Sequence, residues 1–150
     1  MDILRPHESL VLQMLLAGDH PILVHLREQA TDVVVKGRNH TTVGEYVDLA
    51  VASRHAAVEP PNIILGDIDI EVEGVKHGVA TLLYVVDGKL DFIEFATAAD
   101  TWPENPVIKS VKYFREVETA PGSYALEPVP HRDSATLQRA LKGRPAQSAV

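Results

Sequence analysis

One segment of the chain alternates acidic and aliphatic residues without a break from Asp67 to Glu73, in the order DIDIEVE. Successive side chains of a β-strand point to opposite faces of a sheet, so this alternation predicts a strand with one apolar and one acidic face. The strand opens a block, residues 66–103, that has the pattern of a three-stranded meander. The segment therefore commits the chain to an antiparallel sheet with one face towards a core.

Further strand patterns surround this block. Apolar or β-branched runs predict strands at 32–36, 43–52, 63–73, 79–86 and 89–97, and at 107–114 a strand is favoured over a short helix. Asp87 and Gly88 stand between two apolar runs, which is the signal of a two-residue hairpin turn with φ > 0 at both positions. Gly44 indicates a bulge or a close backbone approach in the second strand.

Two helices are expected before the strands. Residues 7–17 carry a broad apolar stripe, and Pro6 before them suits the first turn of a helix. Gly18 ends this helix, and a second short helix runs from Pro21 to about Ala30. The predicted fold class is α+β, with an N-terminal helical hairpin packed on an antiparallel, mostly meander sheet of about five to six strands.

The length of 150 residues fits one domain with a core of its own. We expect a single α+β domain over residues 1–115 and a loosely ordered C-terminal tail over residues 116–150. The tail contains four of the ten prolines and no sustained hydrophobic pattern. Within it, Asp133 could cap a short helix at 134–141.

Composition narrows the function classes. The chain has no cysteine, which excludes a disulfide framework, a thiolate zinc site and a cysteine nucleophile. It has no N-terminal leader pattern and no apolar run near the roughly 20 residues of a membrane span, so we expect a cytoplasmic protein that does not enter the membrane. Residues 59–104 hold ten acidic residues and two basic ones. Such a charge disfavours nucleic acid and suits a basic protein partner, a cation or simple solubility.

Known chemical motifs are missing from the sequence. The seven histidines form no i,i+4 pair on a helix and no H-x-H on a strand, so the spacing of metal ligands is not seen. The serines form no G-x-S-x-G elbow, and the glycines form no phosphate-binding loop. We therefore expect neither a metal nor another cofactor.

Glu94 is the leading candidate for acid/base chemistry. The turn at 87–88 sets a register that places Glu94 on an apolar face beside Thr81. A carboxylate there is costly unless it is hydrogen-bonded or protonated, so it is either an acid/base group or a satisfied structural residue. A simple hairpin at 74–78 would bring Glu71 opposite Thr81 and near Glu94, as a carboxylate pair for catalysis or cation binding. One bulge would move the acids to the opposite face.

The acidic strand and its neighbours form the candidate binding surface. The residues expected on it are Asp67, Asp69, Glu71, Glu73, His77 and Trp102. The four acids should be exposed together, and Trp102 would serve as an interface anchor. The alternatives are a solvated turn histidine for His77 and a lid over one end of the sheet for Trp102.

Three motifs resemble those of a family of small, largely uncharacterised bacterial proteins. They are GDIDIEVEGVKHG at 66–78, DGKLDFIE at 87–94 and Trp-Pro-Glu at 102–104, and the resemblance extends over roughly residues 7–104. The family has Gly-Phe-Thr-Tyr after the glutamate where this chain has Phe-Ala-Thr-Ala at 95–98, so a family site lined by those aromatic residues would be altered here. The compact form is similar to that of small immunity-type proteins that neutralise bacterial toxins.

Three functional hypotheses remain open. The favoured one is a protein-binding module that docks a basic partner, such as a toxin-like protein, on its acidic sheet face. The first alternative is a small carboxylate-dependent enzyme that uses Glu94, with Glu71 or Asp69 as a second carboxylate. The second is an oligomerisation module that associates with further copies of itself. An enzyme is less favoured than a binding protein because no nucleophile, metal or nucleotide motif accompanies the acids.

Overall fold

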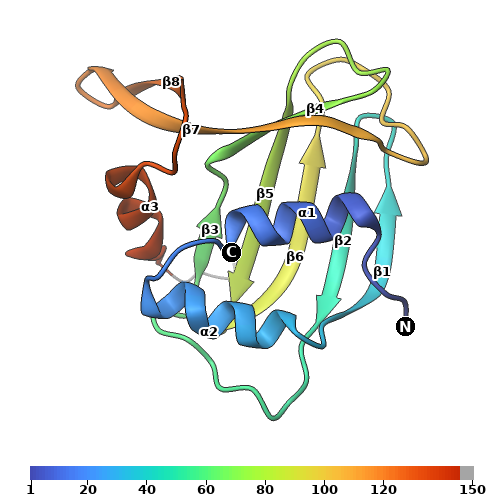
Figure 1. Ribbon diagram of the computed structural model, residues 1–150, viewed down its shortest axis with the longest axis vertical. Coiled ribbons are helices and arrows are strands. Elements are labelled where there is room, and N and C mark those ends of the chain that lie inside the picture. Colours follow the sequence, from blue (N-terminus) through green and yellow to red (C-terminus); the bar gives the residue numbers. More distant parts are fainter. Residues whose placement is uncertain (146–150) are drawn as a thin grey trace.

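The computed structural model describes residues 1–145 (Figure 1). The helices are α1 (Pro6–Leu15), α2 (Pro21–Ala30) and α3 (Ser134–Leu141). The strands are β1 (Val34–His40), β2 (Gly44–Ala50), β3 (Ile63–Leu65), β4 (Ile68–Val72), β5 (Val79–Val86), β6 (Lys89–Ala96), β7 (Ile108–Ala120) and β8 (Ser123–Val129). None of the described helices is long and apolar enough to cross a membrane.

The eight strands form one open antiparallel sheet in the order β1-β2-β6-β5-β4-β7-β8, and β3 pairs with β5 as well. The predicted α+β class and the two N-terminal helices are confirmed. The predicted number of strands, five to six, is wrong. It is too low because the strand expected at 63–73 is two strands and because a further strand follows residue 120.

Two helices cover one face of this sheet, which we call the inner face (Figure 1). The side chains that α1 and α2 turn towards it are fully buried, among them Val11, Leu15, Leu23 and Leu26. They pack on inward-facing strand residues such as Ile93 in one hydrophobic core. Burial of apolar area is the main force that holds the helices on the sheet.

The hairpin turn between β5 and β6 forms as predicted, with φ values of 53° at Asp87 and 80° at Gly88. Val85 pairs with Leu90, but one residue later the register shifts, and Tyr84 pairs with Phe92 and Leu82 with Glu94. Asp91 is therefore the extra residue of a β-bulge, which moves all following side chains of β6 to the other face. The predicted placement of Glu94 on an apolar face is wrong, since it lies on the uncovered face of the sheet.

The predicted strand at 63–73 is broken at Gly66 and Asp67. A Cβ atom at Gly66 would overlap the side chain of Leu82, and Asp67 turns inward instead of continuing the alternation. Beyond the break, Asp69 pairs with Ala80. The expected pairing of Glu71 with Thr81 is therefore wrong: Glu71 is exposed on the uncovered face, while Thr81 is buried on the inner face.

The segment after residue 116 is not the loose tail that its prolines suggested. Its first part extends β7 to Ala120, β8 follows, and α3 packs near β3. The predicted helix at 134–141 is confirmed, and Asp133 caps it by accepting a hydrogen bond from the backbone N–H of Thr136 at 3.0 Å. The last part of the predicted tail, 146–150, lies outside the described residues.

Candidate functional site

The outer face is the side of the sheet that α1 and α2 leave uncovered. Strand pairing gathers aromatic and acidic side chains on it, from Tyr46, Asp48, Asp69, Glu71, Tyr84, Asp91, Phe92 and Glu94. Loss of hydration raises the pKa values of Asp91 and Asp69. The positive charges of Lys36, near Asp91, and Lys112, near Asp69, offset only part of this rise. Five of these residues are acids, whereas Arg139 and Arg144 line hollows of the same face near α3, so the negative charge of this face lies on the strands of the sheet itself.

Glu94 sits at the centre of the aromatic group. Its two carboxylate oxygens accept hydrogen bonds from two tyrosine hydroxyls, Oε2 from Tyr46 at 3.2 Å and Oε1 from Tyr84 at 3.3 Å. The ring of Phe92 stacks on Tyr84, with centroids 4.1 Å apart, and lies 6.1 Å from the ring of Tyr46. The negative charge of Glu94 raises the pKa of Tyr46, and burial together with that charge raises the pKa of Tyr84.

Two pairs of carboxylates flank this group. Asp69 is exposed, but the neighbouring backbone and side chains remove part of its hydration and so raise its pKa, and the charge of Glu71 adds to the effect. Burial likewise raises the pKa of Asp91, with a further contribution from Asp48. A raised pKa means that the charged form of a carboxylate is destabilised. A cation that binds the carboxylate stabilises this form, because its charge offsets the repulsion and the lost hydration.

A groove runs along the outer face from the aromatic group towards the β7–β8 hairpin. It consists of three adjoining hollows of about 440, 550 and 490 Å³. Tyr84 lines the first two and Leu82 lines the last two, so the hollows share walls. Tyr124 and Leu126 of β8 also line the groove, although both are exposed. The groove can therefore take apolar side chains next to the acids.

The sequence-predicted binding residues separate into two groups. Asp69, Glu71, Glu73 and His77 are exposed, but Asp67 is buried and makes an ion pair with Arg132, with Asp67 Oδ1 and Arg132 Nη2 2.8 Å apart. The expectation that all four acids share one exposed face is therefore wrong for Asp67.

Trp102 is 1 % exposed and stacks on Phe95, with ring centroids 5.2 Å apart, so it belongs to the core and is not exposed as an interface anchor. The expected lid position of Trp102 agrees better with this burial.

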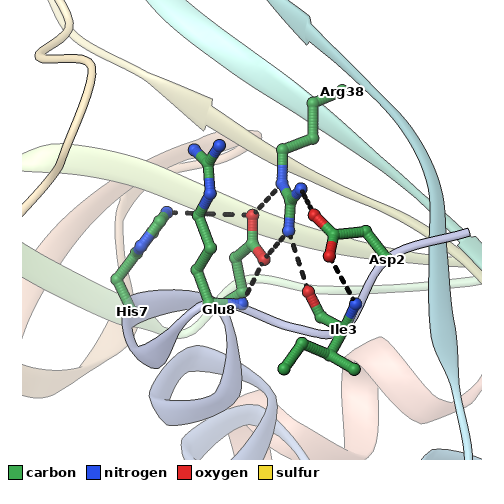
Figure 2. A network of polar contacts seen from close by, with 6 residues as sticks. Asp2, Ile3, His7, Glu8 and Arg38 are labelled. Atoms are coloured by element: carbon green, nitrogen blue, oxygen red, sulfur yellow. Dashed lines mark hydrogen bonds and ion pairs between the residues drawn. The ribbon is translucent and has the colours of Figure 1, made fainter.

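A second group of polar residues, not identified as a site from the sequence, lies on the inner face. We call it the buried polar cluster and define it as His7, Glu8, Arg38 and Glu45. Figure 2 shows Arg38 between the carboxylates of Asp2 and Glu8, with His7 on the far side of Glu8. Arg38 donates from Nε to Glu8 Oε2 and from Nη2 to Glu8 Oε1, both at 2.8 Å, and from Nη1 to Asp2 Oδ2 at 2.7 Å.

The remaining members of the cluster lack such partners. His7 and Glu45 are 5 % and 4 % exposed, and both His7 Nε2 and Glu45 Oε1 are buried without a hydrogen bond. His7 Nε2 lies 3.9 Å from Glu8 Oε2, beyond hydrogen-bond reach. Unpaired buried polar atoms are rare in folded proteins and call for an explanation.

The electrostatics of the cluster differ from one acid to the next. Burial raises the pKa of Glu45, and the charge of Glu8 raises it further. Burial also opposes ionisation of Glu8, but the bonds from Arg38 and from the backbone N–H of Arg5 outweigh it and hold the pKa of Glu8 below its usual range. Burial lowers the pKa of His7, which favours the neutral imidazole.

The sequence does contain a signal for this cluster. Glu45 follows the same alternation as Val47 and Leu49, which are both inward-facing core residues. Glu8 lies three and four residues before Val11 and Leu12, on the buried stripe of α1. A charged residue in phase with a core stripe marks a buried polar group even where no metal motif is present.

Comparison of the chain with protein-family models, with curated proteins and with solved structures finds no match. The resemblance to the bacterial family therefore stays a prediction, and the function has to be argued from the site itself.

Proposed function

We propose that this chain is a protein-binding module whose outer face docks a basic partner. One observation carries the proposal: Tyr46 and Tyr84 both donate to Glu94 at the centre of an uncovered, acidic sheet face. A carboxylate framed by aromatic rings suits a cationic side chain, because the charge pairs with the carboxylate while the stem packs on the rings. Arginine fits best, since its planar fork bonds a carboxylate and stacks on aromatic rings.

The surrounding surface supports a protein rather than a small cation as the partner. The carboxylates of Asp48 and Asp91 flank Glu94 and the aromatic side chains around it. Asp69 and Glu71 lie further along the same face. The groove beside them has apolar walls, including Leu82 and Tyr84, but Lys112, Arg139 and Arg144 line it as well. The basic side chains of a partner would therefore meet the acids of the strands, and its apolar side chains would enter the groove. A partner with several basic residues and a few apolar ones would match both features.

The acidic face and the resemblance to small immunity-type proteins together suggest what kind of partner this would be. An immunity-like role, in which the chain neutralises a basic toxin-like protein in the cytoplasm, is the most specific form of the proposal. Complementary charge would speed the association and make it sensitive to salt. No acid/base role for Glu94 is proposed, because the apolar surroundings that suggested one are on the other face of the sheet.

The proposal can be tested with isotope-labelled protein and an oligo-arginine peptide as the probe. We expect amide shifts that centre on Tyr46, Phe92 and Glu94 and that weaken as salt is added. The variant Glu94→Gln keeps the shape of the side chain and removes its charge, so it should weaken binding. The matched control is Glu28→Gln, which removes an exposed charge from α2 on the opposite side of the sheet.

Two results would overturn the proposal. One is a set of shifts spread over all acidic surfaces, with the same affinity in both variants. The other is a self-associated protein whose outer face is covered, which size-exclusion chromatography would show and which would favour the oligomerisation hypothesis.

A further inference from the structure

The buried polar cluster contains two atoms that need a partner. His7 Nε2 and Glu45 Oε1 are enclosed by protein and make no hydrogen bond within the described residues. A buried polar atom without a partner costs roughly 1–3 kcal/mol, more if it is charged. Two such atoms in one cluster point to a partner that both of them lack.

The geometry leaves room for one bridging atom. Ligand atoms of His7, Glu8 and Glu45 all lie within 4.8 Å of one another. Two ligands that each lie about 2.0–2.1 Å from a zinc ion are roughly 3.4 Å apart at a tetrahedral angle. The measured 3.9 Å between His7 Nε2 and Glu8 Oε2 is near this value. A small rotation of the His7 side chain, whose Nε2 atom has no hydrogen bond, closes the difference.

The charges around the gap favour a cation. The carboxylates of Asp2, Glu8 and Glu45 face the guanidinium groups of Arg5 and Arg38. Arg38 already forms ion pairs with Asp2 and Glu8, as Figure 2 shows. Glu45 makes no ion pair with any described residue. The uncompensated negative charge is thus that of Glu45, and a buried carboxylate requires a proton or a cation.

We propose that His7, Glu8 and Glu45 bind one divalent transition-metal ion of the zinc type. One imidazole and two carboxylates are an N/O ligand set that suits Zn²⁺. Mg²⁺ and Ca²⁺ fit less well, because they prefer oxygen ligands and need several waters or six to eight ligands, whereas this set has three residues, one of which is an imidazole. A water molecule or a second carboxylate oxygen completes the coordination.

The arrangement around these ligands supports the assignment. Arg38 holds Glu8 by two bonds and so fixes the direction of its carboxylate, as hydrogen-bonded neighbours of metal ligands generally do. His7 and Glu8 belong to α1, and Glu45 belongs to β2, which is far along the chain. The ion would therefore tie the first helix to the sheet, as a structural metal does.

The test uses the full chain, stripped with a chelator and then given Zn²⁺ or Co²⁺. We expect one equivalent of metal to stay bound after desalting, a higher melting temperature, and a Co²⁺ absorption spectrum typical of a low-coordinate N/O site. Glu45→Gln and His7→Phe should each lower the affinity at least tenfold. The matched control is His55→Gln, which removes a largely buried histidine that pairs with Asp32 outside the cluster and should leave the metal affinity unchanged.

Three results would overturn the proposal. The stripped and metal-loaded chains could have the same melting temperature and retain no metal, in which case a proton or a water fills the gap. Glu45→Gln could retain as much metal as the unchanged chain, or His55→Gln could lose it, and either would place the metal elsewhere. If His7→Phe does not fold, Glu45→Gln and the unchanged chain still decide the question.

Discussion

Arg132 holds the carboxylate of Asp67 by two hydrogen bonds, from Nε to Oδ2 at 2.9 Å and from Nη2 to Oδ1 at 2.8 Å, across 65 residues of sequence. Its third nitrogen, Nη1, donates to the carbonyl oxygen of Ala17 at 2.8 Å. One side chain thus joins the segment before α3, the break between β3 and β4, and the end of α1. The C-terminal segment is part of the fold through this contact.

We expect Arg132→Met to destabilise the protein by about 3–5 kcal/mol, because it leaves the buried carboxylate of Asp67 without its cation. Urea unfolding measures the effect. The matched control is Arg115→Met, which breaks a similar two-bond contact to Glu127 between side chains that are 45 % and 52 % exposed. Exposed pairs contribute about 0–1 kcal/mol. Equal losses in the two variants would contradict the structural role of Arg132.

Gln29 connects α2 to the β5–β6 turn. Its Nε2 donates to the carbonyl oxygens of Ala56 and Gly88, and its Oε1 accepts from the backbone N–H of Leu90, each at 3.0 Å. Gln29→Leu leaves the buried N–H of Leu90 unpaired, so we expect a loss of about 1–3 kcal/mol in unfolding free energy. Gln29→Glu should restore the bond to Leu90 but not those to the carbonyls. A neutral effect of Gln29→Leu in thermal unfolding would show that water replaces the amide.

At Gly44 the backbone of β2 lies close to that of β6, and the close backbone approach predicted there is confirmed. A Cβ atom at this position would overlap the carbonyl oxygen of Phe95. We expect Gly44→Ala to cost about 1–3 kcal/mol, because the two strands must move apart. Gly37→Ala is the control, since a Cβ atom there would lie 3.9 Å from the nearest atom, a side-chain oxygen of Asp48. Chemical denaturation should show a lower free energy of unfolding for Gly44→Ala than for Gly37→Ala.

Binding to the outer face should depend on pH in a defined direction. Partial loss of hydration raises the pKa values of the exposed Asp69 and the half-buried Asp91 in the folded chain, so these side chains become neutral at a higher pH than an ordinary aspartate. We therefore expect that, as the pH is lowered, the affinity for oligo-arginine begins to fall at a pH above the range in which ordinary aspartates are protonated. The double variant Asp69→Asn, Asp91→Asn should lose this early part of the fall. An unchanged profile would show that neither residue contacts the peptide.

The same shifts predict the sign of an effect on stability. A raised pKa in the folded state means that the folded chain holds the proton more tightly than the unfolded chain. The contribution of these two aspartates to stability is then complete below their unfolded-state pKa and is lost as the pH rises through their folded-state pKa. At neutral pH, Asp69→Asn should accordingly leave the unfolding free energy unchanged or increase it, as pH-dependent urea unfolding would show.

Local patterns in the sequence were enough to predict much of the fold. The α1 and α2 stripes, the alternation of β4 and the turn at Asp87 and Gly88 all arise from neighbouring residues, and the structure contains each of them. The hairpin β7–β8 was missed because β8 is exposed along nearly its whole length and so shows no apolar alternation. The break at Gly66 and Asp67 was missed because Asp67 fits the alternation of the sequence, whereas in the structure its side chain is buried against Arg132, 65 residues away.

The site was predicted less well than the fold, for two physical reasons. The position of Glu94 depends on a single extra residue in β6, and no local pattern in the sequence marks Asp91 as a bulge. The buried polar cluster depends on contacts between α1, β1 and β2, so its members lie close together only after folding. Charged residues in phase with the core stripes were visible, but their partners were not.

The bulge at Asp91 bears on how chains of this kind can change length over time. Deletion of Asp91 would close the bulge and restore the regular pairing, because Tyr84 already pairs with Phe92 and Leu83 with Ile93. Glu94 would stay on the outer face and Phe95 in the core. Insertion of one further residue into β6 would instead need a second bulge or turn the following side chains to the opposite face. An alignment of related sequences should therefore tolerate a one-residue gap at Asp91, and the residues after this gap should keep their inward and outward alternation.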